Sequence, residues 1–281
     1  TDKGRNNNPP RQIDTRKVIQ ILDDCEAMGV RAIQFTGGGE PCAHKDHHQL
    51  FGAVLDRGME LALVTNGTML TQETIELLGS CASWVRVSLD AGNEDTYHAV
   101  RHVPKAQFSK ALATIGHLAA HKKKTGSNLV LGVGFVVTPD NWLDVIEATM
   151  KAKALGADNI RISAMFSQND ERPYEHFYSE AKNLIGQARE CASETFQVID
   201  RFGDRIEDLR ARSPDYERCG YQHFTTYIGG DQNVYRCCNT AYNLHGLLGS
   251  IENRRFSEFW MSEETQRALY EFHAPSCQRC Q

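Results

Sequence analysis

The stretch from Phe35 to Pro41, which reads Phe-Thr-Gly-Gly-Gly-Glu-Pro, constrains the fold of this chain more than any other. The apolar run 32–35 before it predicts a buried strand, which the glycines and the proline end abruptly. Glycines let the backbone approach a ligand closely, and Glu40 then lies at the carboxyl end of a strand, where α/β folds bind ligands. A carboxylate in that position suits an ammonium group. The alternative is a glycine-rich turn with a solvated Glu40.

Strands and helices alternate along the chain from this stretch onward. Apolar runs that end in small or polar residues predict five strands, at 32–35, 61–64, 84–88, 129–137 and 159–163. Apolar residues at helical spacing predict helices before them, at 18–28, 49–57, 72–78, 108–122 and 141–155. This alternation predicts an α/β fold with parallel strands and right-handed crossovers. Because the pattern opens on a helix, capped by Asp14 or Thr15, we expect a first strand upstream of Thr1.

Charge and composition exclude several classes of protein. The net charge of -5 and the scattered Lys and Arg residues argue against a nucleic-acid partner. No apolar run reaches the roughly 20 residues of a membrane span, and no signal peptide precedes the first helix, so we expect a cytoplasmic protein with no membrane partner. Nine cysteines without an export signal favour metal ligation over disulfides.

Three motifs in order along the strands resemble those of the radical S-adenosylmethionine (radical SAM) superfamily. They are 38–41 (Gly-Gly-Glu-Pro) followed by His44 and Asp46, 65–67 (Thr-Asn-Gly), and 87–90 (Val-Ser-Leu-Asp). The resemblance implies a partial (β/α)6, TIM-like barrel. It also implies a [4Fe-4S] cluster on a CxxxCxxC loop after the first strand, with one iron left open for S-adenosylmethionine. This sequence contains no CxxxCxxC. We therefore expect the motif upstream of Thr1, together with the first strand.

The resemblance also implies roles for residues at the strand ends. Glu40 is expected to hold the methionine ammonium, with Gly38 and Gly39 giving the backbone room to approach. Ser88 and Arg101 match residues that lie near the methionine carboxylate or ribose in many members, and we expect both side chains to point into the same barrel mouth as Glu40. An ordinary surface arginine is the alternative for Arg101.

Other residues near the strand ends are assigned smaller roles. Ser163 and Met165 follow the last predicted strand, where the family packs adenine. Asp90 and Asn66 are expected to organise their turns. The remaining histidines and cysteines are assigned no ligand role: His44, His47 and His48, for which a helix start is the better explanation, and Cys25, Cys42, Cys81 and Cys191.

The barrel pattern appears only up to residue 165. Beyond it we expect a helix over 174–192, a short strand at 196–199, and an irregular charged linker at 204–214. The predicted domains are a barrel at 1–200 and a small β-hairpin and Fe-S domain at 201–281.

Four cysteines in the second domain suggest a metal centre. Cys277 and Cys280 form a CxxC knuckle, and Cys219 and Cys237 complete a set of four, as a [4Fe-4S] cluster or a structural zinc requires. A predicted hairpin, 224–228 with 233–237, delivers Cys237. Since side chains alternate along a strand, only one of Cys237 and Cys238 is expected to face the metal. The alternative is buried free cysteines beside one CxxC.

This second region resembles the Twitch domain, the shortened relative of the SPASM domain that follows many radical SAM barrels. The resemblance covers Cys219 to the end of the chain and favours Cys237, because 234–237 (Val-Tyr-Arg-Cys) matches a common Val-Tyr-Pro-Cys run. It also favours an auxiliary [4Fe-4S] cluster over zinc.

Together these features predict a radical SAM oxidoreductase or maturase. The resemblance implies that it forms a 5′-deoxyadenosyl radical from S-adenosylmethionine, which abstracts hydrogen from a peptide or a small molecule such as a sugar or aminocyclitol. A flavodoxin- or ferredoxin-type electron donor is the expected partner. The alternative is a non-catalytic barrel that binds S-adenosylmethionine or a partner, with a structural zinc or Fe-S knuckle.

Overall fold

A curved sheet of six parallel strands forms the larger part of the molecule. The computed structural model describes residues 12–165, 171–211 and 213–277. The sheet has its strands in chain order, each paired in parallel with the next. They are β1 (Ala32–Phe35), β2 (Glu60–Thr65), β3 (Trp84–Ser88), β4 (Val130–Val137), β5 (Asn159–Ala164) and β6 (Gln197–Arg201). The predicted α/β class with a partial barrel of parallel strands is confirmed.

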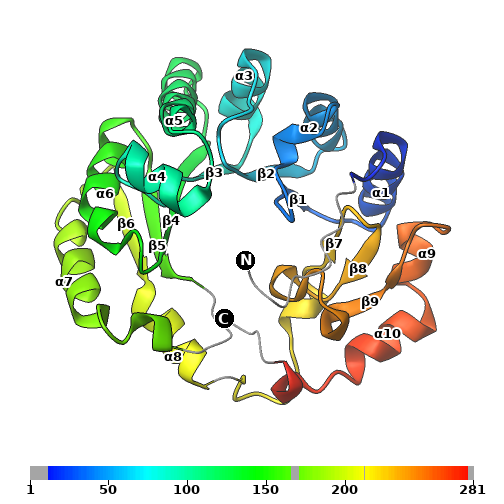
Figure 1. The fold of residues 1–281 in the computed structure, drawn as a ribbon. Helices are drawn as coiled ribbons and strands as arrows, with labels where there is room; N and C mark the ends of the chain where they lie inside the picture. Colours follow the sequence, from blue (N-terminus) through cyan, green and yellow to red (C-terminus); the bar gives the residue numbers. More distant parts are fainter. Residues whose placement is uncertain (1–11, 166–170, 212, 278–281) are drawn as a thin grey trace.

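Helices lie along the outside of this sheet (Figure 1). They are α1 (Thr15–Ala27), α2 (His47–Asp56), α3 (Gln72–Cys81), α4 (Glu94–Arg101), α5 (Ala106–Thr125), α6 (Val145–Ala154), α7 (Tyr178–Arg189) and α8 (Phe202–Ala211). Asp14 caps α1, accepting a hydrogen bond from the Arg16 amide. Each helix buries one face only, and among the described helices none combines the length and apolarity needed to cross a membrane.

The two faces of the sheet differ in chemistry. The residues that face the helices are apolar and almost fully buried, among them Leu61, Leu63, Val85, Val87, Leu131, Val133, Phe135, Ile160 and Ile162. The alternate residues of β3 and β5 are polar or aromatic and only half buried: Trp84, Arg86, Ser88, Asn159, Arg161 and Ser163. Since strand side chains alternate, the concave face of the sheet is polar while the convex face is the core.

The barrel continues past the point where the sequence pattern appeared to end. The strand expected at 196–199 is β6, and it pairs in parallel with β5 as the sixth strand. The stretch 204–214, expected to be an irregular linker, falls largely within helix α8. Its apolar residues Phe202, Ile206 and Leu209 recur at helical spacing and are buried. The many charges between them made this helix read as a linker.

The first strand is less buried than expected. Ala32 and Gln34 of β1 are exposed, and Ile33 and Phe35 are half buried. Within the described residues β1 pairs only with β2, so it is an edge of the sheet. Helix α4 was not predicted; Asn93 caps it by accepting from the Asp95 and Thr96 amides.

A small antiparallel sheet and two helices form the C-terminal unit. The sheet has β7 (Tyr227–Ile228), β8 (Asn233–Tyr235) and β9 (Leu247–Ser250), followed by α9 (Phe256–Trp260) and α10 (Glu263–Tyr270). The predicted hairpin is confirmed, although its strands are shorter than expected and β9 adds a third strand. This unit lies beside α1 (Figure 1).

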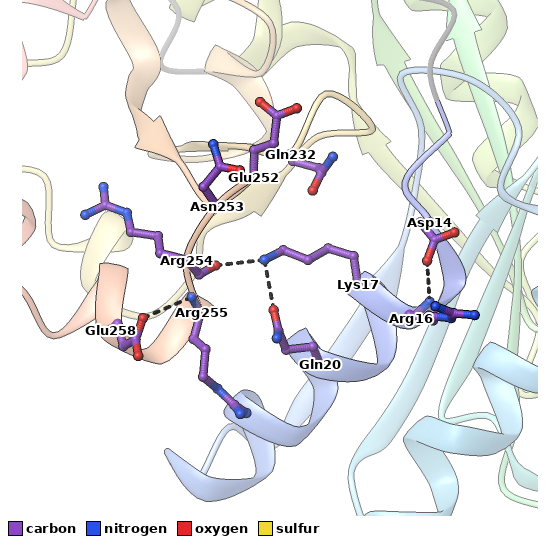
Figure 2. A pocket seen from close by; sticks show the side chains of 10 residues that line it. All are labelled: Asp14, Arg16, Lys17, Gln20, Gln232, Glu252, Asn253, Arg254, Arg255 and Glu258. Carbon is purple, nitrogen blue, oxygen red and sulfur yellow. Dashed lines mark hydrogen bonds between the residues drawn. The ribbon is translucent and has the colours of Figure 1, made fainter.

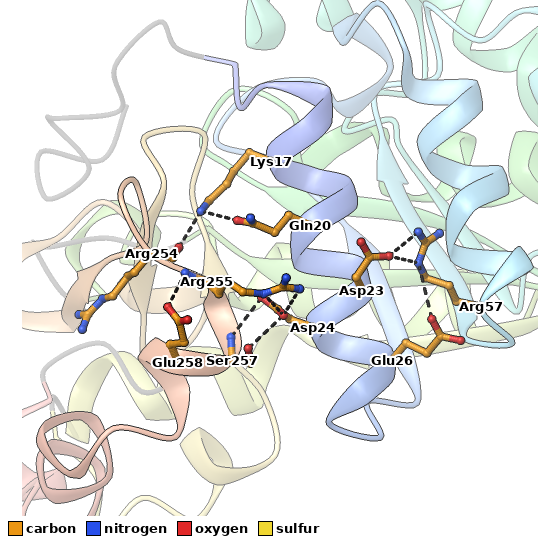
Figure 3. A network of polar contacts seen from close by, with 10 residues as sticks. All are labelled: Lys17, Gln20, Asp23, Asp24, Glu26, Arg57, Arg254, Arg255, Ser257 and Glu258. Carbon is orange, nitrogen blue, oxygen red and sulfur yellow. Dashed lines mark hydrogen bonds and ion pairs between the residues drawn. The ribbon is translucent and has the colours of Figure 1, made fainter.

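A polar joint ties this unit to α1 (Figure 3). Asp24, which is 2% exposed, accepts hydrogen bonds from Arg255 Nε at 2.8 Å and from Ser257 Oγ at 3.0 Å, and pairs with Arg255 Nη2 at 2.6 Å. Lys17 Nζ donates to the Arg254 carbonyl at 2.7 Å. The apolar core also crosses the joint, because Phe256 and Phe259 of α9 belong to the same buried cluster as the barrel core.

Candidate functional site

The Glu40 carboxylate joins the carboxyl ends of β1 and β2. Its Oε1 accepts from Thr65 Oγ1 at 2.6 Å and from the Cys42 amide at 3.1 Å, and its Oε2 accepts from the Asn66 amide at 2.7 Å. These three donors fix the carboxylate. A carboxylate has about four acceptor positions, so Glu40 retains one for a further donor such as an ammonium group.

The glycines before Glu40 are placed differently from one another. A Cβ built at Gly39 has no atom of the described residues within 4 Å, so they leave the space beside it open. A Cβ built at Gly38 would lie 2.8 Å from Cζ of Tyr242, closer than real Cβ atoms come to other atoms. Tyr242 comes from the C-terminal unit and packs with Tyr227 and Tyr235 in a small second cluster. The room expected beside Gly38 is therefore taken by an aromatic ring, while no described residue fills the room beside Gly39.

Arg101 reaches from the last turn of α4 to the carboxyl end of β3. Its Nη2 donates to the Ser88 carbonyl at 2.9 Å and pairs with Asp90 Oδ2 at 2.7 Å. Burial raises the pKa of Asp90, against the opposing effects of Arg101 and of the Val136 amide that donates to Oδ1. Arg101 is thus no ordinary surface arginine. Its Nε is buried and has no hydrogen-bond partner within the described residues.

Glu40 and Arg101 share one rim of the sheet. Glu40 follows β1 and Arg101 contacts the end of β3, and parallel strands bring their carboxyl ends to one edge. The charges of both groups act on the buried phenol of Tyr97. Burial is the main cause that raises the pKa of Tyr97; the charge of Arg101 lowers this pKa, and the charges of Asp90 and Glu40 raise it. The structure thus brings these groups together, while their contact with a cofactor stays a prediction.

Ser163 and Met165 lie at the same rim, two strands further along. Ser163 is half buried on the concave face of β5, beside Val136 of β4. The Met165 amide donates to the Val137 carbonyl at 3.2 Å, and its carbonyl accepts from Tyr174 Oη at 2.8 Å. The backbone after β5 is therefore held in place, and the adenine role of these two residues stays a prediction.

The turn residues and histidines are held by local hydrogen bonds. Asn66 Oδ1 accepts from the Thr68 amide at 2.8 Å, so it organises its turn as predicted. The Asp90 carboxylate instead bonds the Val136 amide of β4 and pairs with Arg101. His44 contacts the Ile13 carbonyl at 3.1 Å and His47 contacts Thr74 Oγ1 at 3.2 Å. Helix α2 begins at His47, which places these rings at a helix start.

Three of the four predicted metal ligands lie near enough to Arg236 for their charges to act on it. Burial is the main cause that lowers the pKa of this guanidinium, and Cys219, Cys277 and Cys237 all act on it in the opposite direction. Its Nη1 donates to Gln222 Oε1 at 2.8 Å and its plane lies over Phe272. Cysteines from three separate segments thus lie in one region of the C-terminal unit.

The metal centre is not fully defined by the described residues. Cys280 lies outside them, and among them no group of three or more His, Cys, Asp or Glu side chains is close enough to hold a metal ion. Cys237 is half buried while Cys238 is exposed. The charges of Cys238, Cys237 and Cys219 all act on the Tyr221 phenol, whose pKa is raised mainly by burial, so Cys238 lies in the same region. Convergence on one cluster stays a prediction.

One pocket lies away from the strand ends. It has a volume of about 570 Å³ and lies between α1 and the segment before α9 (Figure 2). Its lining is charged or amide-bearing and includes Lys17, Gln20, Glu252 and Arg254. None of the residues predicted to bind a cofactor or metal lines it.

The sequence analysis missed several residues at the site. Thr65 lies within a motif that was recognised, but its bond to Glu40 was not foreseen. Tyr242 carried no signal, because its contact with Gly38 joins distant segments. Arg86 and Arg161 did carry a signal in the sequence, since each is a single charged residue in the middle of an apolar strand.

Comparison with known proteins matches this chain to a family model and to several relatives. The model of the radical SAM superfamily matches residues 1–148. The AdoMet-dependent heme synthase of Methanosarcina barkeri is 25% identical over 280 residues, covering 93% of this chain and 77% of the relative. The antilisterial bacteriocin subtilosin biosynthesis protein AlbA of Bacillus subtilis is 25% identical over 271 residues, covering 95% of this chain and 57% of AlbA.

A solved structure has the same fold. The crystal structure of Streptococcus suis SuiB bound to S-adenosylmethionine matches 92% of this chain with a TM-score of 0.66 and 14% sequence identity. The match covers 60% of SuiB. At this identity the likeness establishes the fold, and it includes both the barrel and the C-terminal unit.

Proposed function

Because this chain belongs to the radical SAM superfamily of enzymes, we propose that it binds S-adenosylmethionine at the carboxyl ends of β1 to β5 and uses it to modify a peptide or a small organic molecule. The observation that carries this proposal is the placement of Glu40. Three donors hold its carboxylate at the end of β1, and one acceptor position remains for the methionine ammonium.

Ser88 and Arg101 supply complementary groups at the same rim. The Arg101 guanidinium is held by Asp90 and the Ser88 carbonyl, and its buried Nε has no partner within the described part of the chain. A buried donor without a partner is costly, so a bound acceptor is expected there. The methionine carboxylate and the ribose hydroxyls of the cofactor are acceptors of this kind.

The bound cofactor supplies the capacity to remove hydrogen from an unreactive carbon. The chain supplies the positioning. Glu40 and Arg101 hold opposite charges of the methionine part, Ser163 and Met165 lie where adenine is expected, and the apolar convex face leaves only the concave face for substrate.

The C-terminal unit is proposed to hold an auxiliary [4Fe-4S] cluster on Cys219, Cys237, Cys277 and Cys280. The charges of Cys219, Cys237 and Cys277 all act on Arg236, which places these three cysteines in one region and supports the proposal. With four protein ligands the cluster has no open position, so electron transfer or structural support is its role. A flavodoxin- or ferredoxin-type protein is the proposed electron donor.

Peptides and small molecules both remain in the proposed substrate class. The printed names of relatives point to both kinds of product, a heme in one case and a bacteriocin in the other. A solved structure of SuiB with its precursor peptide adds a peptide case on the same fold. These substrates belong to those proteins, and they support the proposal for this chain only at the level of class.

The test is anaerobic reconstitution of the full-length protein with iron, sulfide, reductant and S-adenosylmethionine. The expected result is bound iron and formation of 5′-deoxyadenosine. Glu40→Ala is expected to abolish most of the product, while Glu60→Ala, an exposed acid at the start of β2, leaves it unchanged. Iron-loaded protein that forms no 5′-deoxyadenosine would refute the proposed activity.

A further inference from the structure

Strands β3 and β5 carry the same pattern, in which an arginine follows one apolar residue and precedes another, with a serine after that. β3 reads Val85-Arg86-Val87-Ser88, and β5 reads 160–163, Ile-Arg-Ile-Ser. In both strands the arginine and the serine face the concave side, because their apolar neighbours are buried against the helices. Each arginine therefore lies one layer deeper in the barrel than the serine of its own strand, and the register places Arg161 level with Ser88.

Strand β4 lies between these two arginines and leaves room for them. Gly134 of β4 pairs with Ser88 on one side and with Arg161 on the other. A Cβ built at Gly134 would lie 3.3 Å from Cδ of Arg86, so the Arg86 side chain runs across this glycine toward β5. Neighbouring strands are about 4.8 Å apart, and the two guanidinium groups thus share one small area of the concave face.

Neither arginine has a counter-charge among the residues that the structure describes. Within this part of the chain, Arg86 and Arg161 form no hydrogen bond or ion pair, and Nε of Arg86 is buried without a partner. The Arg86 guanidinium lies against the Trp84 ring, 5.2 Å from its centroid. Burial lowers the pKa of Arg86, and the charge of Arg161 lowers it further. Two adjacent cations without an anion are unfavourable unless a ligand supplies the negative charge.

We propose that Arg86 and Arg161 together bind a carboxylate of the substrate, so that the substrate is an organic acid or an acidic peptide. This inference rests on the proposed function, because it names the substrate class of the same barrel. A guanidinium presents two parallel N–H donors that match the two oxygens of a carboxylate. The half-exposed Trp84 ring beside Arg86 supplies an apolar surface for the carbon skeleton next to that group.

The surroundings support an anion over other ligands. Arg205 of α8 is close enough for the charge of Arg161 to act on it: burial is the main cause that lowers the pKa of Arg205, Asp208 opposes this, and Arg161 lowers the pKa further. Asp90, two residues after β3, is already paired with Arg101 at the rim. A substrate carboxylate held by Arg86 and Arg161 on the concave face would leave Glu40 at the rim for the cofactor.

The test measures binding of an amphipathic carboxylate, 1-pyrenebutyrate, to the full-length protein by fluorescence titration, with neutral 1-pyrenebutanol as its counterpart. Arg86→Gln and Arg161→Gln are each expected to weaken 1-pyrenebutyrate binding about 10-fold or more, because a charged hydrogen bond is lost. Binding of 1-pyrenebutanol should not change. Arg86→Lys keeps the charge and is expected to retain part of the affinity.

Arg189→Gln serves as the matched control, because Arg189 is an exposed arginine at the end of α7. It should bind both probes as the unaltered protein does. Equal affinity of the double variant Arg86→Gln/Arg161→Gln and the control for 1-pyrenebutyrate overturns the proposal.

S-adenosylmethionine also carries a carboxylate, so its binding to the same variants is measured by calorimetry. Unchanged affinity is expected. A loss equal to that for 1-pyrenebutyrate assigns the arginines to the cofactor and overturns the substrate inference. Since probe binding needs no turnover, a protein that forms no 5′-deoxyadenosine yet binds the probe through these arginines fails the proposed function alone.

Discussion

At the scale of single residues, Glu40 combines a structural and a binding role in one carboxylate. It closes the ends of β1 and β2 through Thr65, Asn66 and Cys42, and keeps one acceptor position open. We expect Glu40→Ala to weaken S-adenosylmethionine binding by about 1.5–3 kcal/mol, the contribution of a hydrogen bond to a charged group. Calorimetry measures this affinity. The same affinity in Glu40→Ala and Glu60→Ala would remove Glu40 from the binding site.

Cys237 and Cys238 allow an equally local test. Cys237 is half buried and acts on Arg236 together with Cys219 and Cys277, whereas Cys238 is exposed. We expect Cys237→Ala to lose the auxiliary cluster and Cys238→Ala to keep it. Iron content and visible absorption after anaerobic purification distinguish the two variants. The opposite outcome would mean that the ligand register is wrong by one residue.

Sequence reasoning reached some of these residues and not others for a physical reason. The shared rim of Glu40, Ser88 and Arg101 was expected from the resemblance to the radical SAM superfamily, which implies that all three face one barrel mouth. The contact of Tyr242 with Gly38 depends on how the C-terminal unit packs, and no local pattern encodes it. Arg86 and Arg161 were visible as charges in apolar strands, but only the register shows that they are neighbours.

At the scale of elements, the joint between α1 and α9 rests on one of two adjacent aspartates. Asp24 is buried and accepts from Arg255 and Ser257, whereas Asp23 pairs with Arg57 at the surface. We expect Asp24→Ala to lower the free energy of unfolding by about 1–3 kcal/mol, discounted because Arg255 is partly exposed. Asp23→Ala should cost about 0–1 kcal/mol. Urea denaturation of both variants gives the comparison, and equal losses would contradict it.

The joint between α1 and α9 should make the stability of the protein depend on pH. Burial alone raises the pKa of Asp24, but the bonds from Arg255 and Ser257 outweigh it and lower that pKa. A lowered pKa in the folded state adds stability above the ordinary Asp pKa of about 3.9, which is lost as pH falls through the folded pKa. The stability difference between the native protein and Asp24→Asn should therefore shrink on acidification from about pH 6 to pH 3. A difference that stays constant over this range would exclude the titration of Asp24 as its source.

Strands with continuous apolar runs were predicted well from the sequence. Helix α8, whose apolar residues are separated by charged ones, was not predicted as a helix. β2, β3, β4 and β5 all occur where apolar runs meet turn residues. α8 was taken for a linker because its three buried residues are separated by charges. β6 was predicted as a strand, but its place in the sheet depends on a long-range pairing with β5.

At the scale of the whole molecule, the barrel and the C-terminal unit share one core. Val234, Ile251, Phe256 and Phe259 belong to the same buried cluster as the barrel residues. We therefore expect the two parts to unfold together, in one calorimetric transition with equal van't Hoff and calorimetric enthalpies. Asp24→Ala should move that single transition to lower temperature without splitting it. Two separate transitions in the unaltered protein would show that the parts are independent.

The Tyr242 ring against Gly38 has a consequence for how this protein can change over generations. A glycine in the barrel is required by a side chain that the C-terminal unit contributes, so position 38 cannot take a larger residue while the ring at 242 is present. A larger residue at 38 becomes acceptable only after the ring at 242 has been replaced by a smaller one. The residues at positions 38 and 242 should therefore co-vary among related sequences. In a chimera that carries the C-terminal unit of a distant relative, that unit would fit this barrel only if its residue at position 242 left room for residue 38.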